Sequence, residues 1–241
     1  MGLMDKLLGG NVLYFPGCLT NYVFKDLKEN YEKILKICGI RFIELGDIVC
    51  CGSPVKNAGY MNIFKDLARK NFKLFQKYHI KKIITNCPAC YHVLAYEYPK
   101  VLGKKLEVEH ASISIFKVLN KLKLTELKLR AVYHDPCHLG RYSGIYEEPR
   151  KILKAMGIEL VEFEFNMENS FCCGGGGGVS ANYPDLAEAM ARERINQAKE
   201  IGVKNVITCC PLCYANLMKG AQDTDVKVIE LSQLLIKAIK V

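Results

Sequence analysis

The sequence predicts an α/β protein built from two pseudo-symmetric repeats, each a small, mostly parallel sheet flanked by helices. Two observations predict this fold. Short β-rich runs alternate with helical patterns, and a series of motifs occurs twice in the same order. Val12–Cys18 is matched by Ala131–Cys137, and in both copies Cys-Cys-Gly and then Cys-Pro-x-Cys follow. We expect a first repeat over residues 1–124 and a second over residues 125–241.

The elements of the first copy follow from its residue patterns. Runs rich in β-branched and aromatic residues predict strands, and apolar residues at helical spacing predict helices. In chain order the prediction is strand Val12–Phe15, helix Lys25–Ile37, strand Arg41–Leu45, helix Ile63–Tyr78, strand Lys82–Thr85 and a closing strand and helix in Glu107–Leu122.

The second copy repeats this alternation of strands and helices. Its predicted elements are strand Leu129–Tyr133, strand Glu159–Phe165, helix Ala187–Ile201, strand Asn205–Thr208 and a closing strand and helix in Lys227–Ile239. The stretch Lys151–Ile158 repeats Lys33–Ile40. A five-glycine run, Gly174–Gly178, precedes the long helix. It lacks the Lys and Ser/Thr of a nucleotide-binding P-loop, so we expect it to allow close backbone approach to a cluster or substrate.

Composition excludes several classes of protein. The chain has 241 residues, 50% hydrophobic and 24% charged, which is typical of globular proteins rather than disordered or fibrous ones. The net charge of +9 is scattered and forms no basic block interleaved with aromatics, so we expect no nucleic-acid partner. No apolar run is long enough to cross a bilayer, and no export signal is recognisable. We therefore expect a cytoplasmic protein, which partners could bring to a membrane.

The twelve cysteines are the most informative feature of the composition. In a cytoplasmic protein, a large number of cysteines usually indicates metal binding or redox chemistry. Ten of them form two matching sets, and all members except Cys90 and Cys213 fall just after predicted strands. Because ligand sites of α/β sheets lie beyond the carboxyl ends of the strands, we expect each set to converge. The sets are Cys18, Cys50, Cys51, Cys87 and Cys90, and Cys137, Cys172, Cys173, Cys210 and Cys213.

Five thiolates at one site favour an iron–sulfur cluster over zinc. Zinc takes four ligands, often from two Cys-x-x-Cys pairs, whereas each copy has one such pair and five cysteines. Adjacent cysteines such as Cys50 and Cys51 suit the bridging of two metal atoms. Zinc in one of the two sites stays open, as does a zinc-stabilised scaffold without redox activity. Cys38 is expected to pack as a small hydrophobe.

These motifs resemble the cysteine-rich CCG-domain family. The domain of that family occurs twice in a subunit of heterodisulfide reductase and in iron–sulfur subunits of glycolate, lactate and glycerol-3-phosphate oxidation. The resemblance implies two noncubane [4Fe-4S] clusters that face one another and cleave a disulfide substrate, with the ten cysteines above as ligands. Cys209, which lies beside Cys210 where the first copy has Asn86, is an alternative ligand to Cys210.

Two functions follow from the resemblance. The first is a subunit that reduces a small-molecule disulfide within a heterodisulfide reductase-like complex and is active only with partner subunits. The second is an electron-transfer subunit of a flavin-dependent hydroxy-acid or glycerol-3-phosphate dehydrogenase. The sequence contains no ferredoxin-type C-x2-C-x2-C-x3-C-P run, so we expect a ferredoxin-like iron–sulfur subunit and a flavoprotein subunit as partners.

Two histidines distinguish the second copy from the first. His134 and His138 stand where the first copy has Phe15 and Leu19. Disulfide reduction consumes protons, which a histidine beside a cluster could deliver. Both are candidate proton donors, with His138 the better one. The alternative is that each only hydrogen-bonds a thiolate or a backbone group.

Overall fold

The computed structural model describes residues 11–240 and divides into two compact units. The first ends at Ser114 and the second begins at Ile115, within the helix α8 (Ala111–Phe116). The predicted division of the repeats at residues 124 and 125 falls inside the second unit and stays a prediction. Each unit is described by itself.

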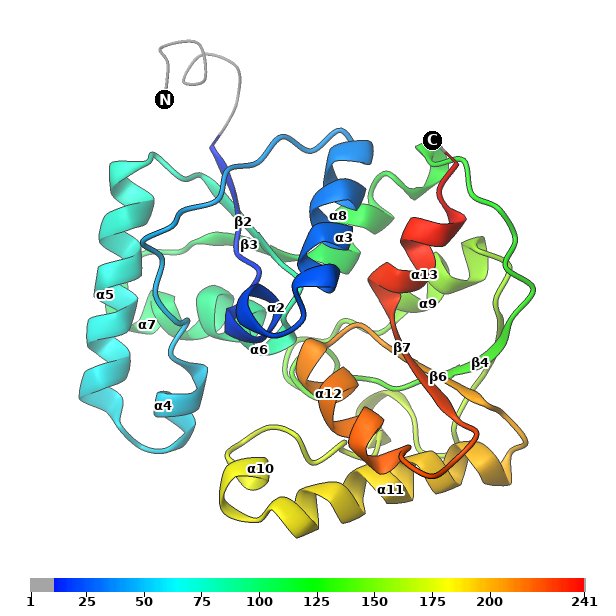
Figure 1. Ribbon diagram of the computed structural model, residues 1–241. Coiled ribbons are helices and arrows are strands. Elements are labelled where there is room, and N and C mark those ends of the chain that lie inside the picture. Colours follow the sequence, from blue (N-terminus) through cyan, green and yellow to red (C-terminus); the bar gives the residue numbers. More distant parts are fainter. Residues whose placement is uncertain (1–10, 241) are drawn as a thin grey trace. The chain divides into compact units, whose positions relative to one another are not determined.

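The first unit is built on a three-stranded parallel sheet of order β1-β2-β3 (Figure 1). Two long helices of this unit, α3 (Lys25–Ile37) and α5 (Met61–Lys77), each present one apolar face that is buried. The strands are β1 (Val12–Tyr14), β2 (Lys82–Thr85) and β3 (Glu107–His110).

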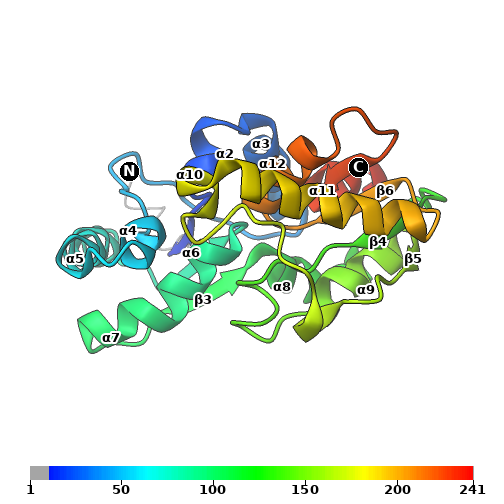
Figure 2. The ribbon, with the colours of Figure 1, turned by 90° about the horizontal axis from the view of Figure 1, so that it is seen from below.

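The second unit has the same topology with one more strand. Its four parallel strands have the order β5-β4-β6-β7. Figure 2 shows α9 (Glu147–Ala155) and α11 (Pro184–Glu200) on opposite sides of this sheet. The strands are β4 (Arg130–Tyr133), β5 (Glu159–Val161), β6 (Asn205–Thr208) and β7 (Lys227–Glu230).

The other helices are short and connect these layers. In the first unit they are α2 (Cys18–Tyr22), α4 (Ser53–Asn57), α6 (Pro88–His92), the π-helical turn Val93–Glu97 and α7 (Tyr98–Leu102). In the second they are α10 (Val179–Asn182), α12 (Pro211–Gly220) and α13 (Leu231–Ala238), with 3₁₀ turns at Leu119–Lys121 and Met167–Asn169.

Small residues let α11 and α12 pack closely. Ala187, Ala191 and Ala198 are buried on one face of α11. A Cβ added at Gly220 would lie 2.5 Å from the backbone carbon of Ala191, so only glycine allows this approach. The close packing holds the carboxyl-terminal end of α12, the helix that Cys210 caps and that contains Cys213.

The fold class and most predicted elements are confirmed. Helix Lys25–Ile37 and strands Lys82–Thr85 and Asn205–Thr208 have the predicted bounds. Within the described residues, no helix is long and apolar enough to span a membrane.

Two strand predictions need correction. Arg41–Leu45 forms no strand, because only Ile43 pairs with β1, through hydrogen bonds of 3.0 Å from Tyr14 N and 2.9 Å to Val12 O. Its neighbour Glu44 instead forms an ion pair with Lys28. Glu159–Phe165 ends as a strand at Val161, because the chain then turns to bury Phe163 beneath the guanidinium of Arg194, 3.4 Å from the ring centroid.

Candidate metal centres

Cys18, Cys87, Cys137 and Cys210 lie just beyond the carboxyl ends of β1, β2, β4 and β6, as predicted, whereas the segment before Cys50 and Cys51 forms no strand. Cys18 begins α2 just after β1, and Cys87 follows β2 and caps α6. In the second unit Cys210 follows β6 and caps α12, where its sulfur accepts a 3.5 Å hydrogen bond from Cys213 N. The free amides at a helix N-terminus favour a negative sulfur there, and proline at the first helical position has no amide of its own that would need a partner. Both caps are followed by proline.

The five thiols of the first unit form one continuous set of contacts. The Cys51 and Cys90 sulfurs are 3.3 Å apart. Further thiol contacts join Cys18 to Cys50, Cys50 to Cys51, and Cys87 to Cys90. The structure thus brings together residues separated by up to 72 positions in the chain, and we call them the first cysteine set.

The second unit repeats this arrangement member for member. The Cys173 and Cys213 sulfurs are also 3.3 Å apart. Cys137 contacts Cys172, Cys172 contacts Cys173, and Cys213 contacts Cys210. These five residues are the second cysteine set. The order of contacts matches that of the first set, which indicates that both units build the same kind of site.

The electrostatics of these sets fit a multi-metal centre with soft ligands. A hydrogen bond from Cys50, followed by one from Cys90, lowers the pKa of Cys51 to about 5. The pKa of Cys90 is raised, first by its hydrogen bond to Cys51. All twelve cysteines are free thiols. Packed thiols cannot all ionise without a cation among them, and five thiolates exceed the four that one zinc ion takes. The donor set therefore fits an iron–sulfur cluster.

The glycine of each Cys-Cys-Gly motif has a specific structural role. Gly52 and Gly174 have positive φ values of 87° and 80°, and each donates a backbone hydrogen bond of 3.4 Å to the sulfur two residues earlier. A Cβ would lie 2.7 Å from Phe64 at Gly52 and 2.8 Å from Ala187 O at Gly174. Only glycine allows both the conformation and the contact.

Replacement of Gly174 by alanine tests this role. We expect Gly174→Ala to lower the free energy of unfolding by about 1 to 3 kcal/mol, because a left-handed non-glycine residue is strained and the added methyl group meets backbone. Gly177→Ala is the matched control, since Gly177 has a φ of 66° but nothing within 4 Å of its added Cβ. Urea unfolding followed by circular dichroism measures both. Equal losses in the two variants would contradict the role of the contact.

Cys209 lies outside the second cysteine set. It is completely buried, and its sulfur is 2.9 Å from Tyr133 Oη. The first unit has the same arrangement with a different residue, because Tyr14 Oη donates to Asn86 Oδ1 at 3.0 Å. Cys209 thus contacts Tyr133 and Cys210 contacts Cys213, and the choice between the two as ligand stays a prediction.

The two candidate proton donors have different surroundings. His138 is adjacent to the second set, with Nδ1 3.4 Å from Cys137 Sγ and its ring 5.0 Å from that of Tyr142. His134 is 1% exposed, and one of its ring nitrogens lies within 4.8 Å of the sulfurs of Cys173 and Cys213. Burial, followed by the charge of Arg194, lowers the pKa of His134 to about 3. Their proton-donor roles stay a prediction.

Sequence reasoning missed a buried ionic network beside the second set. Both Asp135 and Arg150 are almost fully buried, and their bidentate hydrogen bonds are 2.6 and 2.8 Å long. Arg150 also binds Glu162 twice at 2.8 Å, and Asp135 accepts a 2.9 Å hydrogen bond from Met167 N. The network holds the loop that leads to Cys172. Asp135 could have been noticed because it lies within the Tyr-His-Asp-Pro-Cys motif, but no local pattern marks Arg150.

Buried side chains on the long helices hold the approach to each Cys-Cys pair. Asn71 on α5 accepts from Val49 N at 3.0 Å and donates to Cys50 O at 3.3 Å. Arg194 on α11 donates to Phe165 O at 3.0 Å and Ser170 Oγ at 3.3 Å. Asn71 and Arg194 are both the eleventh residue of a 17-residue helix, so one structural position carries a neutral amide in one unit and a cation in the other.

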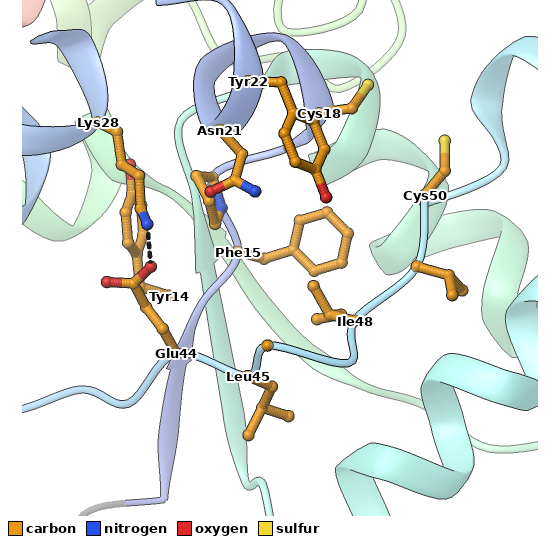
Figure 3. Close-up of a pocket in the computed structure, with 14 residues that line it drawn as sticks. Tyr14, Phe15, Cys18, Asn21, Tyr22, Lys28, Glu44, Leu45, Ile48 and Cys50 are labelled. Atoms are coloured by element: carbon orange, nitrogen blue, oxygen red, sulfur yellow. Dashed lines mark ion pairs between the residues drawn. The ribbon is translucent and has the colours of Figure 1, made fainter. Parts of the chain in front are cut away.

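A pocket of about 150 Å³ lies beside the first cysteine set. Figure 3 shows the Cys18 and Cys50 side chains at one end of the pocket and the Lys28–Glu44 ion pair at the other end. The rings of Phe15 and Tyr22 lie near the two cysteines. That ion pair has an N···O distance of 2.6 Å. The pocket therefore combines two thiols, apolar walls and charged groups.

Comparison with known proteins identifies the family. The family model described as a cysteine-rich domain, CCG, matches the chain twice, over residues 12–95 and 131–218. The chain belongs to the CCG cysteine-rich domain family. The resemblance found in the sequence is confirmed, and each match contains one of the two cysteine sets.

Proteins similar to this chain include redox enzymes. One subunit of the dihydromethanophenazine:CoB--CoM heterodisulfide reductase from Methanosarcina barkeri is 34% identical over 95% of this chain and 59% of its own length. An EtfAB:quinone oxidoreductase from Syntrophomonas wolfei is 32% identical over 95% of this chain and 34% of its own. The chain thus spans about a third to three fifths of these relatives. Its membership supports iron–sulfur clusters as the class of cofactor.

One solved structure shares the fold. A hypothetical protein from Helicobacter pylori has a TM-score of 0.66 and 11% sequence identity, covering 94% of this chain and 48% of its own. At this identity the likeness concerns the architecture alone.

Proposed function

We propose that this CCG protein is an iron–sulfur redox subunit of a heterodisulfide reductase-like complex that reduces a disulfide-type substrate. One observation carries the proposal: two five-thiol sets with the same order of contacts occur in a chain whose relatives include a heterodisulfide reductase subunit. Each set would hold one noncubane [4Fe-4S] cluster. The ligands would be Cys18, Cys50, Cys51, Cys87 and Cys90 in the first unit and Cys137, Cys172, Cys173, Cys210 and Cys213 in the second. Zinc in one site is the alternative metal.

The reaction sets the requirements for the chain's own residues. Reduction of a disulfide breaks one S–S bond, consumes two electrons and two protons, and yields two thiols. Bound clusters would supply one-electron storage and transfer. The electrons would come from partner redox subunits, while this chain would orient the substrate sulfurs and deliver protons.

His138 is the residue we assign to proton delivery in the second unit. Its Nδ1 lies 3.4 Å from Cys137 Sγ, and its side chain is only partly buried, so its ring can exchange protons with solvent. His134 is buried and its pKa is about 3, so it would carry no second proton near neutral pH. It suits a fixed polar contact better than proton delivery.

The pocket beside Cys18 and Cys50 is the binding site we assign to one arm of the substrate. Its volume of about 150 Å³ admits a small group, and its apolar walls would contact a carbon chain. The ion pair between Lys28 and Glu44 at the far end offers one positive and one negative group to a polar terminus (Figure 3).

Partner subunits would complete the electron path. The relatives are longer than this chain, and the chain itself carries no ferredoxin-type cysteine run. We propose a ferredoxin-like iron–sulfur subunit and a flavoprotein subunit as electron donors, in a cytoplasmic complex that could lie at a membrane through its partners.

The second candidate function is electron relay without substrate reduction. The 32% identity to an EtfAB:quinone oxidoreductase favours it, because the name of that relative describes electron transfer to a quinone. In that case the chain would pass electrons from a flavin-dependent dehydrogenase to an acceptor.

Anaerobic purification with metal and sulfide analysis is the first part of the test. We expect iron and acid-labile sulfide in both units and no zinc in excess of trace. Zinc without iron would contradict the proposal and favour a zinc-stabilised scaffold. Anaerobic handling matters because exposed thiols oxidise once a cluster is lost.

Substrate reduction is the second part. The holoprotein is mixed with a heterodisulfide of two small thiols and reduced benzyl viologen, and oxidation of the dye is followed at its absorbance band. Turnover with one electron pair per disulfide supports the reductase. Fully loaded protein that neither turns over nor changes its electron paramagnetic resonance spectrum on adding the disulfide would contradict it and leave the relay.

A further inference from the structure

The two cysteine sets have different surroundings. Three residues before Cys18 the first unit has Phe15, which is 3% exposed, and at the same place before Cys137 the second unit has His134, which is 1% exposed. The buried phenyl ring of the first unit therefore corresponds to a buried imidazole in the second unit. The difference matters because an imidazole carries an N–H and a lone pair, while a phenyl ring carries neither.

His134 faces the sulfurs of its own unit. One of its ring nitrogens lies within 4.8 Å of both Cys173 Sγ and Cys213 Sγ. Within the described residues, neither Nδ1 nor Nε2 has a hydrogen-bond partner. A buried polar group without a partner costs about 1 to 3 kcal/mol, so a buried imidazole in this position indicates a partner among the groups that fill the site.

The charges near His134 add to this difference. Arg194 is completely buried, and both it and Arg141 are close enough to His134 to lower its pKa. Asn71, at the equivalent position of the first unit, carries no charge. Reduction adds one negative charge to a metal centre, and this charge is stabilised by nearby cations and by polar hydrogens directed at the sulfurs.

We propose that His134 is a direct polar contact of the metal centre in the second unit and makes that centre the more readily reduced of the two. The proposal rests on the proposed function only in requiring an iron–sulfur centre in each cysteine set. An N–H directed at a sulfur and a nitrogen bonded to a metal ion both raise a reduction potential relative to a thiolate-only environment. Phe15 gives the first centre neither interaction.

The experiment is an anaerobic redox titration of the full-length holoprotein followed by electron paramagnetic resonance. Cys51→Ser and Cys173→Ser preparations, each lacking one centre, assign the signals to the two units. We expect the second centre to have the higher midpoint potential in the unaltered protein. His134→Phe should shift that midpoint downward while the first stays unchanged.

Two further variants make the result decisive. Phe15→His places an imidazole in the first unit and should shift the first midpoint upward. His134→Gln keeps an N–H donor of similar reach and should shift the second midpoint less than His134→Phe. His79→Gln, at an exposed histidine on a loop, is the control and should change neither. Selective ¹⁵N labelling of histidine should alter the nitrogen couplings of the second centre, and His134→Phe should remove the coupling that remains in a His138→Gln background.

The outcomes separate the two proposals. Iron–sulfur signals from both units, with a second midpoint that is lower than the first or unchanged in His134→Phe, overturn this inference and leave the proposed function intact. A second unit without iron beside a first unit with iron overturns this inference alone, and the absence of iron from both units overturns both proposals. If His134→Phe fails to fold, the Phe15→His variant decides, because an unchanged first midpoint then overturns the inference.

Discussion

Cys173→Ser is expected to remove about half of the bound iron, because in the proposed function each unit holds one cluster of the same size. Cys173 is 3% exposed, and its sulfur is 3.3 Å from Cys213 and in contact with Cys172. A serine hydroxyl is a poor ligand for iron that prefers thiolate, so the second centre should not assemble. Iron and sulfide analysis of anaerobically purified protein measures the loss.

Two controls define this result. Cys51→Ser, the equivalent change in the first unit, should remove the other half of the iron and the other set of paramagnetic signals. Cys38→Ser should leave iron unchanged, since Cys38 ends α3 and belongs to neither set. Complete loss of iron from Cys173→Ser would show that the two centres depend on one another. Full retention would exclude Cys173 as a ligand.

Arg150→Met is expected to lower the free energy of unfolding by about 3 to 5 kcal/mol, because removal of one partner leaves the other charge buried without compensation. Arg150 is 2% exposed and makes bidentate contacts with both Asp135 and Glu162. Its guanidinium also lies 5.1 Å from the ring centroid of Tyr133. Urea unfolding of the holoprotein measures the loss.

Arg130→Met is the matched control, because the ion pair of Arg130 with Glu159 is exposed to solvent on both sides. Exposed ion pairs contribute about 0 to 1 kcal/mol to stability, so the free energy of unfolding of this variant should stay close to that of the unaltered protein. The double variant Asp135→Asn with Arg150→Met should lose less stability than Arg150→Met alone, since no charge is then left without its partner at Asp135. Similar losses in Arg150→Met and Arg130→Met would contradict the account of a buried network.

Much of the fold could be predicted because its signals are local. The strand Lys82–Thr85 and the helix Lys25–Ile37 follow from short-range residue patterns, and the structure gives them the same bounds. Because the motifs occur twice, most elements could be predicted from two separate stretches of sequence. The failure at Arg41–Leu45 has the opposite cause: a strand needs a pairing partner along its length, and only Ile43 has one.

The convergence of the cysteines could be predicted, but not the surroundings of the two sets. Several of the repeated cysteines follow strands, and the carboxyl ends of parallel strands bring them together whatever lies around them. The partners of Asp135 and the position of Arg194 depend on contacts between segments distant in sequence. The role of Cys209 was open for the same reason, because its partner Tyr133 lies 76 residues away.

The order of residues alone is enough to predict the duplicated α/β architecture and the two sets of five cysteines, because periodicity and spacing along the chain encode both, and the resemblance of these motifs to a known family points to the CCG domain. The differences between the two sites emerge only in the folded chain. Folding places the imidazole of His134 among the sulfurs of one unit and Phe15 at the same position in the other. Folding also buries the cation of Arg194 in the second unit, where the first unit buries the neutral amide of Asn71 at the equivalent position. Burial and electrostatic surroundings arise from packing between distant segments, and these properties distinguish two sites whose motifs look alike.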